Sequence, residues 1–245
     1  MPLDLNASSP TDRAAQLNAE FGQAEPEVIL RQALQSAGVG LTAMVSSFGA
    51  ESVVLLHMLS KVDRLVPVLF LDTEMLFHET LTYQRELAEQ LKLNTRIITP
   101  DREAVFARDG EGLLHRRDPD ACCALRKSEP LEKALSNFDA WITGRKRAQG
   151  GVRAEMDVFE ADNGKLKVNP LASYTTEQVQ DYITRHKLPR HPLVARGFPS
   201  IGCAPCTTKA KPNEDPRAGR WRGQEKVECG IHLVDGKFQK TGDAA

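Results

Sequence analysis

Short apolar runs alternate with longer helical segments over the first three quarters of the chain. The runs have the length of buried strands and lie at residues 41–46, 66–71, 95–99 and 140–143. Helical periodicity or an apolar stretch of helix length marks residues 11–37, 52–62, 78–91, 122–135 and 175–186. This alternation predicts an α/β fold with a mostly parallel central sheet and helices on both of its faces.

The first helical segment is expected to end before Gly38 and Gly40. Its predicted buried positions are Leu17, Phe21, Val28, Ile29 and Leu34. The last helix is expected to begin at a capping box formed by Thr175 and Gln178.

The composition changes at about residue 189. From there the chain is rich in Pro, Gly and Arg and holds three of the five cysteines. We expect one domain over 1–245, with an α/β core at about 40–188 and an irregular C-terminal segment at about 189–245.

Charge and hydropathy narrow the functional classes. The net charge of −1 gives no overall basic field, so nucleic acid is not an expected partner. No stretch approaches the roughly 18 apolar residues of a membrane span, and the first residues do not resemble a signal peptide. We therefore expect a cytoplasmic protein, in which grouped cysteines more often bind metal or act in catalysis than form disulfides.

Four cysteines form two pairs. Cys122 and Cys123 are adjacent, and Cys203 and Cys206 stand in a Cys-Ala-Pro-Cys motif. The adjacent pair alone is explained equally well by two buried core residues, but with the second pair a metal centre becomes the better explanation. A structural zinc site remains an alternative, although the adjacent pair weakly favours a 4Fe–4S cluster.

Cys229 lies outside both pairs, in the sequence ECGIH at 228–232. Gly230 frees the backbone beside it, and His232 could favour the reactive thiolate. An inert cysteine is the alternative explanation from position alone.

The segment SSFGAES at 46–52 joins a predicted strand to a predicted helix. Helix N-terminal amides and serine hydroxyls favour an anion site there, although a serine-capped turn is equally compatible with the pattern. Basic side chains cluster near the same strand ends and cysteines, namely Arg126, Lys127, Arg145, Lys146, Arg147, Arg153, Arg217, Arg220 and Arg222. Together they indicate an anionic ligand with several oxygens.

Seven blocks of sequence, in order, resemble the adenylyl-sulfate and 3′-phosphoadenylyl-sulfate reductase family. They are SSFGAES, LDTEMLFHET (71–80), CCALRKSEPL (122–131), WITGRKRAQGGVR (141–153), NPLASYTTEQVQDYI (169–183), SIGCAPCT (200–207) and ECGIH. The resemblance implies an adenine-nucleotide α-hydrolase-like fold. One departure is Gly150-Gly151, where the family usually has Ser-Pro, although Arg153 stays in register.

The resemblance also implies roles for individual residues. Cys229 is the expected nucleophile, and Cys122, Cys123, Cys203 and Cys206 match the ligands of one 4Fe–4S cluster. SSFGAES becomes a modified pyrophosphate-type loop, with Ser46, Ser47, Phe48, Gly49 and Ser52 at the substrate. The nucleotide is expected beside Leu71, Asp72, Thr73 and Gly144. The sulfate and phosphate are expected beside Lys127, Arg153, Arg217, Arg220 and His232.

The activity implied by the resemblance is reduction of adenylyl sulfate to sulfite and AMP in assimilatory sulfate reduction. The electron donor is expected to be reduced thioredoxin or glutaredoxin, and a homo-oligomer is possible. The alternatives are a 3′-phosphoadenylyl-sulfate or dual-specificity reductase, an ATP pyrophosphatase, and a zinc-stabilised nucleotide-binding module without enzymatic activity.

Overall fold

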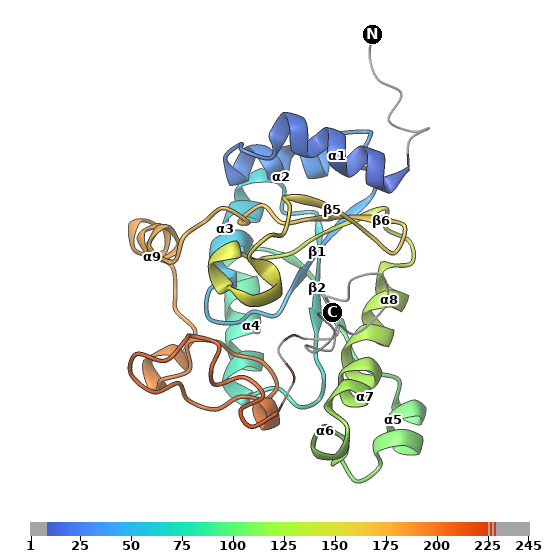
Figure 1. The fold of residues 1–245 in the computed structure, drawn as a ribbon, viewed down its shortest axis with the longest axis vertical. Helices are drawn as coiled ribbons and strands as arrows, with labels where there is room; N and C mark the ends of the chain where they lie inside the picture. Colours follow the sequence, from blue (N-terminus) through green and yellow to red (C-terminus); the bar gives the residue numbers. More distant parts are fainter. Residues whose placement is uncertain (1–8, 225, 227, 229–245) are drawn as a thin grey trace, which may run out of the picture.

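The computed structural model describes residues 9–224, 226 and 228. Six strands form one sheet in the order β3-β2-β1-β4-β6-β5, parallel except for β5 at one edge (Figure 1). The strands are β1 (Thr42–Ser46), β2 (Pro67–Leu71), β3 (Asn94–Ile98), β4 (Ala140–Ile142), β5 (Phe159–Asp162) and β6 (Lys165–Val168). The predicted α/β fold with a mostly parallel sheet is confirmed.

Alternate residues of the central strands enter two different cores, as the two-residue period of a strand requires. In β2, Val68 and Phe70 pack in the larger core, whereas Leu69 and Leu71 pack in the smaller one. In β4, Ile142 faces the larger core. The next residue towards the start of β4, Trp141, faces the smaller core. The central strands are therefore buried on both faces, which explains why β1, β2 and β4 are mostly apolar runs, whereas the edge strand β3 is largely exposed.

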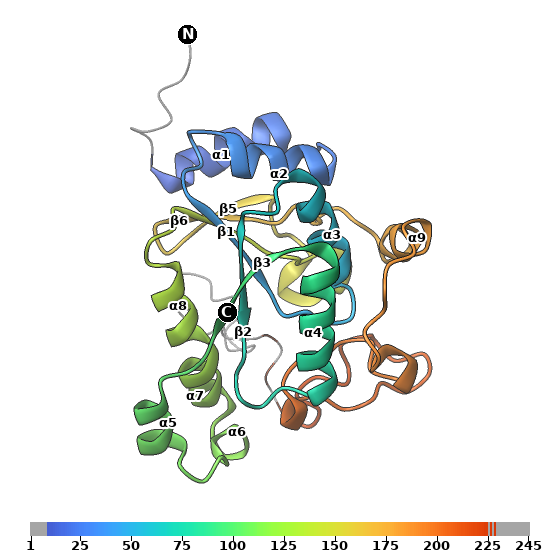
Figure 2. The ribbon, with the colours of Figure 1, turned by 180° about the vertical axis from the view of Figure 1, so that it is seen from behind.

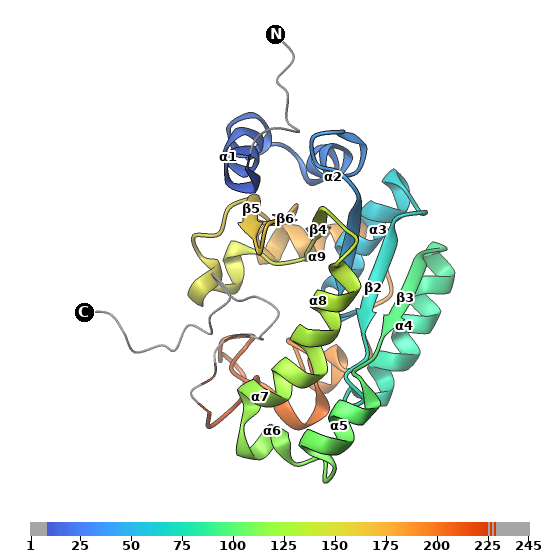
Figure 3. The same cartoon turned by 90° about the vertical axis from the view of Figure 1, so that its right-hand side faces the viewer.

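Helices cover each face of the sheet. The larger core takes residues from α1 (Pro10–Phe21), α2 (Pro26–Gln35), α3 (Ser52–Val62), α4 (His78–Leu91) and α9 (Thr176–Arg185). The smaller core lies under α8 (Glu129–Leu135). Seen from the side, α3 and α4 lie on one side of β2 and β3, and α8 lies on the other (Figure 3). From behind, the edge strand β3 runs between α4 and α8 (Figure 2).

Two local predictions were wrong. The segment 11–37 is two helices, because α1 ends at Gly22 and Pro26 begins α2 at a position where its missing N–H costs nothing. Val28, predicted to be buried, is 41% exposed. The hairpin of β5 and β6 was not predicted, although its turn residues Asn163 and Gly164 both have positive φ, as a tight hairpin turn requires.

The predicted helix over 122–135 is interrupted by a turn of π-helix. It comprises α7 (Pro119–Cys123), the π-turn Ala124–Ser128 and α8, preceded by α5 (Arg102–Asp109) and α6 (Leu114–Arg117). The π-turn buries Leu125, Arg126 and Lys127 together. Two consecutive cationic side chains therefore point into the protein, and turns of this type occur frequently at functional sites.

Residues 189–224, 226 and 228, called here the C-terminal lobe, contain no regular strand or α-helix in the part that is described. Its ordered turns are the 3-10 segments Val194–Arg196 and Ala204–Cys206. A small apolar cluster of Leu193, Phe198 and Ile201 lies inside it. The prediction of irregular structure after residue 189 is confirmed for these residues.

The C-terminal lobe is attached to α4 and to the loop after β2. The Ala204 amide donates to the Met75 carbonyl at 2.8 Å, and the Tyr83 hydroxyl donates to the Pro189 carbonyl at 2.8 Å. Among the helices described, none is long and apolar enough to cross a membrane.

Candidate active site

A cavity of about 260 Å³ lies at the carboxyl ends of β1, β2 and β4. From β1 the chain adds β2 and β3 on one side, and β4 then lies on the other side of β1. The strand order thus reverses between β1 and β4. Ligands of open α/β sheets bind outside the strand ends at such a switch point.

The loop after β1 forms the floor of this cavity. The Ser46 hydroxyl accepts from the Phe48 amide at 3.2 Å, and the Ser52 hydroxyl accepts from the Gly49 amide at 3.0 Å. Each serine still has its own hydroxyl hydrogen to donate. A Cβ on Gly49 would lie 3.2 Å from Ser47 Oγ, a tight contact within the loop, and 3.5 Å from the Ile201 carbonyl oxygen, an ordinary contact with the C-terminal lobe.

Most of the predicted substrate-binding residues that the structure describes line the cavity. They are Ser46, Ser47, Gly49, Ser52, Leu71, Thr73, Lys127, Gly144, Arg153, Arg217 and Arg220. These residues come from segments that are far apart in sequence. The fold therefore brings together the groups that the motifs selected, and their contacts with substrate stay predictions.

Phe48 and Asp72 do not line the cavity. Phe48 has a φ of +47°, and its fully buried ring packs edge-on against Phe70 with the ring centres 5.3 Å apart. Its side chain therefore belongs to the core, and only its backbone lies in the loop. The Asp72 carboxylate accepts from the Glu74 amide at 2.9 Å and shapes the turn after β2.

The cavity has an apolar wall and a basic wall. Apolar surface, called here the apolar wall, comes from Met44, Leu71 and Trp141 on the strands, from Leu55 on α3 and from Leu171 after β6. Six basic and three acidic residues are among the described residues of the lining, the basic ones being Lys127, Arg145, Lys146, Arg153, Arg217 and Arg220. A ligand with a flat aromatic ring against the apolar residues and an anionic group among the basic residues would match both parts of the lining.

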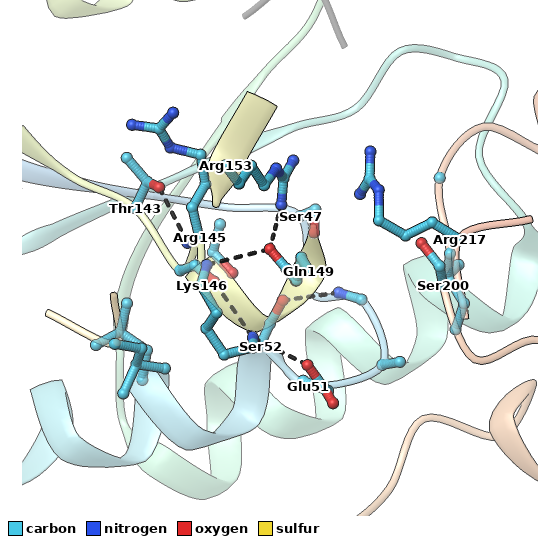
Figure 4. A pocket seen from close by; sticks show the side chains of 18 of the residues that line it. Ser47, Glu51, Ser52, Thr143, Arg145, Lys146, Gln149, Arg153, Ser200 and Arg217 are labelled. Carbon is cyan, nitrogen blue, oxygen red and sulfur yellow. Dashed lines mark hydrogen bonds and ion pairs between the residues drawn. The ribbon is translucent and has the colours of Figure 1, made fainter. Parts of the chain in front are cut away.

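Arg153 and Arg217 reach the same point from different parts of the chain. Arg153 ends the 3-10 turn Gly151–Arg153, and Arg217 belongs to the C-terminal lobe (Figure 4). Gln149 accepts a hydrogen bond from Arg153. The Glu228 carboxylate bonds to both arginines, at 2.5 Å to Arg153 Nε and 3.3 Å to Arg217 Nη2.

Two more cations of the lining have acidic partners. Lys146 Nζ lies 2.9 Å from Glu51 Oε2 at the start of α3 (Figure 4). Arg145 pairs with Glu160 of β5. Burial lowers the pKa of Arg145. Even so, an arginine guanidinium remains charged at neutral pH.

Arg220 stacks on a buried indole. Its guanidinium carbon lies 4.4 Å from the ring centre of Trp221, within cation–π range. A Cβ on Gly202 would collide with this guanidinium, so glycine makes room for it. Arg220 Nε is buried without a hydrogen-bond partner among the described residues.

Several residues of the cavity lining were not among the predicted substrate-binding residues. They are Glu51, Arg145, Lys146, Gln149 and Glu228. All five belong to blocks of the resemblance, and both Arg145 and Lys146 stand in the basic cluster. The two acids were missed because only cations were sought for an anionic ligand.

Both cysteine pairs lie close in sequence to residues of the cavity, since Cys203 follows Gly202 and Cys123 precedes Lys127 by four residues. No disulfide joins any of the four described cysteines, and Cys122, Cys123 and Cys203 are buried. Burial, and then repulsion from Cys203 and Cys206, raises the pKa of the Cys122 thiol to about 11. Such repulsion requires the pairs to be close in space.

Thr73 connects the cysteine pairs to the cavity. Its hydroxyl lies 3.2 Å from Cys203 Sγ, and its carbonyl accepts from Arg126 Nη1 at 3.0 Å. Arg126 belongs to the π-turn after Cys123. The next residue, Lys127, lines the cavity, so the segment that follows the first cysteine pair also supplies a cation of the cavity.

The chemistry of this donor set fits an iron–sulfur cluster, which is held by four cysteine thiolates. Within the described ranges, no three His, Cys, Asp or Glu side chains form a group that could hold a single metal ion. Cys229 and His232 lie outside the described residues.

Comparisons with known proteins agree with this geometry. The phosphoadenosine phosphosulfate reductase domain model matches residues 42–209. An adenosine 5′-phosphosulfate reductase of Mesorhizobium japonicum is 47% identical over 222 residues, covering 90% of this chain and 87% of the relative. A phosphoadenosine 5′-phosphosulfate reductase of Gloeobacter violaceus is 44% identical, covering 84% of this chain and 88% of that protein.

A solved structure shows the same architecture. The phosphoadenylyl-sulfate reductase of Candida auris, in a phosphate complex, superposes with a TM-score of 0.69 at 28% identity. The match covers 80% of this chain and 96% of that structure. With the matched domain spanning more than half of the sequence, the chain belongs to the phosphoadenosine phosphosulfate reductase family of enzymes.

Proposed function

We propose that this enzyme reduces adenylyl sulfate to sulfite and AMP in cytoplasmic sulfate assimilation. The observation that carries the proposal is the cavity at the β1–β4 switch point, with an apolar wall and six basic residues in its lining. Relatives named adenosine 5′-phosphosulfate reductase cover about nine tenths of the chain and support the substrate.

The cavity suggests how the substrate lies. The adenine packs near Met44, Leu55 and Leu171, and the phosphate lies near the loop at 46–52. The sulfo group then extends toward Arg153 and Arg217. One guanidinium group can donate two parallel hydrogen bonds to two oxygens of a sulfate or phosphate, which favours arginine at this end of the cavity.

The chemistry begins at Cys229. Its thiolate attacks the sulfur of the sulfo group, an S–S bond forms, and the S–O bond to AMP breaks. AMP leaves with that electron pair, and the enzyme carries an S-sulfocysteine. The basic residues offset the repulsion between a thiolate and an anionic sulfo group.

A dithiol completes the cycle. One thiolate of reduced thioredoxin, or of glutaredoxin, attacks the Cys229 sulfur and releases sulfite. The second thiol of the donor then releases Cys229 as a thiolate and closes the donor's disulfide. The donor loses two electrons, and the sulfur of the substrate gains them as it becomes sulfite.

Cys122, Cys123, Cys203 and Cys206 would hold one 4Fe–4S cluster. When bound, the cluster orders the cysteine-bearing segments and adds to the electrostatic field at the cavity. Lys127 and Arg126 follow the first pair in the π-turn, so the same segment that holds the cluster positions a cation of the cavity. The dithiol supplies both electrons of the reaction.

The proposal is tested by comparing kcat/KM for adenylyl sulfate and for its 3′-phosphorylated form, with the same reduced thioredoxin. We expect sulfite release and a preference for the unphosphorylated nucleotide, because a 3′-phosphate needs an extra cation near the ribose. Each tenfold preference requires about 1.4 kcal/mol of differential transition-state binding. The Cys229→Ser variant is the control; it should bind nucleotide without releasing sulfite.

Dual specificity is the second candidate, because the relative from Gloeobacter violaceus carries the name of the 3′-phosphorylated substrate. Equal kcat/KM values would support it. No sulfite from either nucleotide, or full activity of Cys229→Ser, would contradict the proposed function.

A further inference from the structure

Glu228 holds the two arginines at the sulfo end of the cavity. Its Oε2 lies 2.5 Å from Arg153 Nε, and its Oε1 lies 2.8 Å from Arg153 Nη2 and 3.3 Å from Arg217 Nη2. The first two contacts form the paired geometry with which arginine binds an oxyanion. The Glu228 side chain is only 13% exposed, so it is enclosed in the lining.

This carboxylate occupies the position that the proposed substrate needs. Arg153 and Arg217 both line the cavity, and both pair with Glu228. A sulfo group requires the same guanidinium donors that Glu228 now uses. Two anions enclosed side by side repel each other, so they cannot both keep these contacts.

We propose that Glu228 is a resident competitor, which holds Arg153 and Arg217 in place while substrate is absent and gives them up to the sulfo group on binding. This inference rests on the proposed function, because it names the substrate group that replaces the carboxylate. It makes Glu228 a positioning residue for the two arginines and a determinant of ligand choice.

The exchange has a consequence for selectivity. A ligand with a sulfo group displaces Glu228 and gains the arginine contacts, so its net affinity is the difference between two sets of bonds. AMP has no sulfo group and leaves Glu228 in place. Removing the carboxylate charge should therefore strengthen binding of adenylyl sulfate and leave binding of AMP unchanged.

The test compares Glu228→Gln with the unchanged residue in protein that carries Cys229→Ser, so that no turnover occurs. Calorimetric Kd values are measured for adenylyl sulfate and AMP. We expect adenylyl sulfate to bind on the order of tenfold more tightly to Glu228→Gln. The Kd of AMP should stay within about twofold, because no displacement is involved.

A matched carboxylate provides the control. Glu214 accepts from Arg222 at 3.1 and 2.7 Å in the same lobe, but neither residue lines the cavity. Glu214→Gln should change neither Kd. This control separates loss of one lobe ion pair from loss of the competitor.

The outcomes are distinct. Unchanged or weaker binding of adenylyl sulfate to Glu228→Gln would overturn the inference. Equal tightening for AMP would also overturn it, because that result indicates a general change in charge. If the parent protein with Cys229 releases no sulfite, the proposed function fails, and this is measured independently of both Kd values.

Discussion

The two halves of the candidate site are built in different ways. The strand-end half follows the central strands of the sheet, which are buried on both faces by two apolar cores. The half in the C-terminal lobe rests on three apolar residues, on ion pairs such as Arg217 with Glu228, and on contacts to α4. The first half is preformed by packing, whereas the second needs polar partners to hold its arginines.

The two halves therefore contribute different features to the site. The strand ends present a fixed apolar wall and loop to a nucleotide. The C-terminal lobe supplies Arg217 and Arg220, whose positions depend on Glu228, Trp221 and the cysteine segment. We therefore expect substitutions in the two halves to separate global stability from local order.

The largest effect is expected in the sheet. Phe70→Ala removes a fully buried ring that packs edge-on against Phe48, and should lower the free energy of unfolding by about 3–5 kcal/mol. Phe106→Ala is the control, because Phe106 is 83% exposed and its loss should change stability by less than about 0.5 kcal/mol. Urea unfolding measures both. Similar losses for the two variants would contradict the assigned core.

An intermediate effect is expected at the boundary of the two halves, at His191. This side chain is fully buried, its Nδ1 accepts from the Leu193 amide at 3.2 Å, and Nε2 therefore donates to Thr80 Oγ1 at 3.1 Å. Burial lowers the pKa of His191 to about 4. The unfolded chain binds a proton near pH 6.5, so stability from this group is complete above that pH.

Acidification from pH 6.5 to 4 should therefore remove about 3 kcal/mol at most through His191. Below pH 4 the folded protein also binds the proton, and this loss stops growing. The measurement is the free energy of unfolding against pH for the wild type and for His191→Asn. If both proteins lose the same amount between pH 6.5 and 4, the buried neutral histidine is not the cause.

The smallest effect on global unfolding is expected from Cys203→Ser. The Arg196 and Lys209 side chains are already exposed, but cleavage by trypsin also needs the backbone around them to unfold locally. Loss of the proposed cluster should loosen the C-terminal lobe and speed cleavage at these two residues, while the sheet loses less than about 1 kcal/mol. Limited proteolysis with mass analysis measures the first effect, and urea unfolding the second. A global loss as large as that of Phe70→Ala would show that the halves are not separable.

The sequence predicted the elements whose signals are local. Apolar runs located β1, β2, β3 and β4, and a capping box located the start of α9 at Thr175. Pro26 and the Asn163-Gly164 turn were also local signals, and their neglect caused the errors at α1, α2, β5 and β6.

Other features depend on geometry that no local pattern encodes. Membership of SSFGAES did not reveal that Phe48 turns its ring into the core, because that follows from a positive φ and from Phe70 on the next strand. The position of Glu228 between two arginines depends on a contact across 75 residues of sequence. The motifs therefore selected the cations of the site but not the acids that hold them.

The π-turn at Ala124–Ser128 sets how far α7, with Cys122 and Cys123, is rotated about the helix axis relative to α8. Each residue of an α-helix advances the chain by about 100° and 1.5 Å. Deleting one residue within 124–128 would rotate Cys122 and Cys123 by roughly that angle relative to α8 and shift them by only about 1.5 Å along the helix axis. The segment should therefore reject a change of one residue in length even where Leu125, Arg126 and Lys127 are all retained.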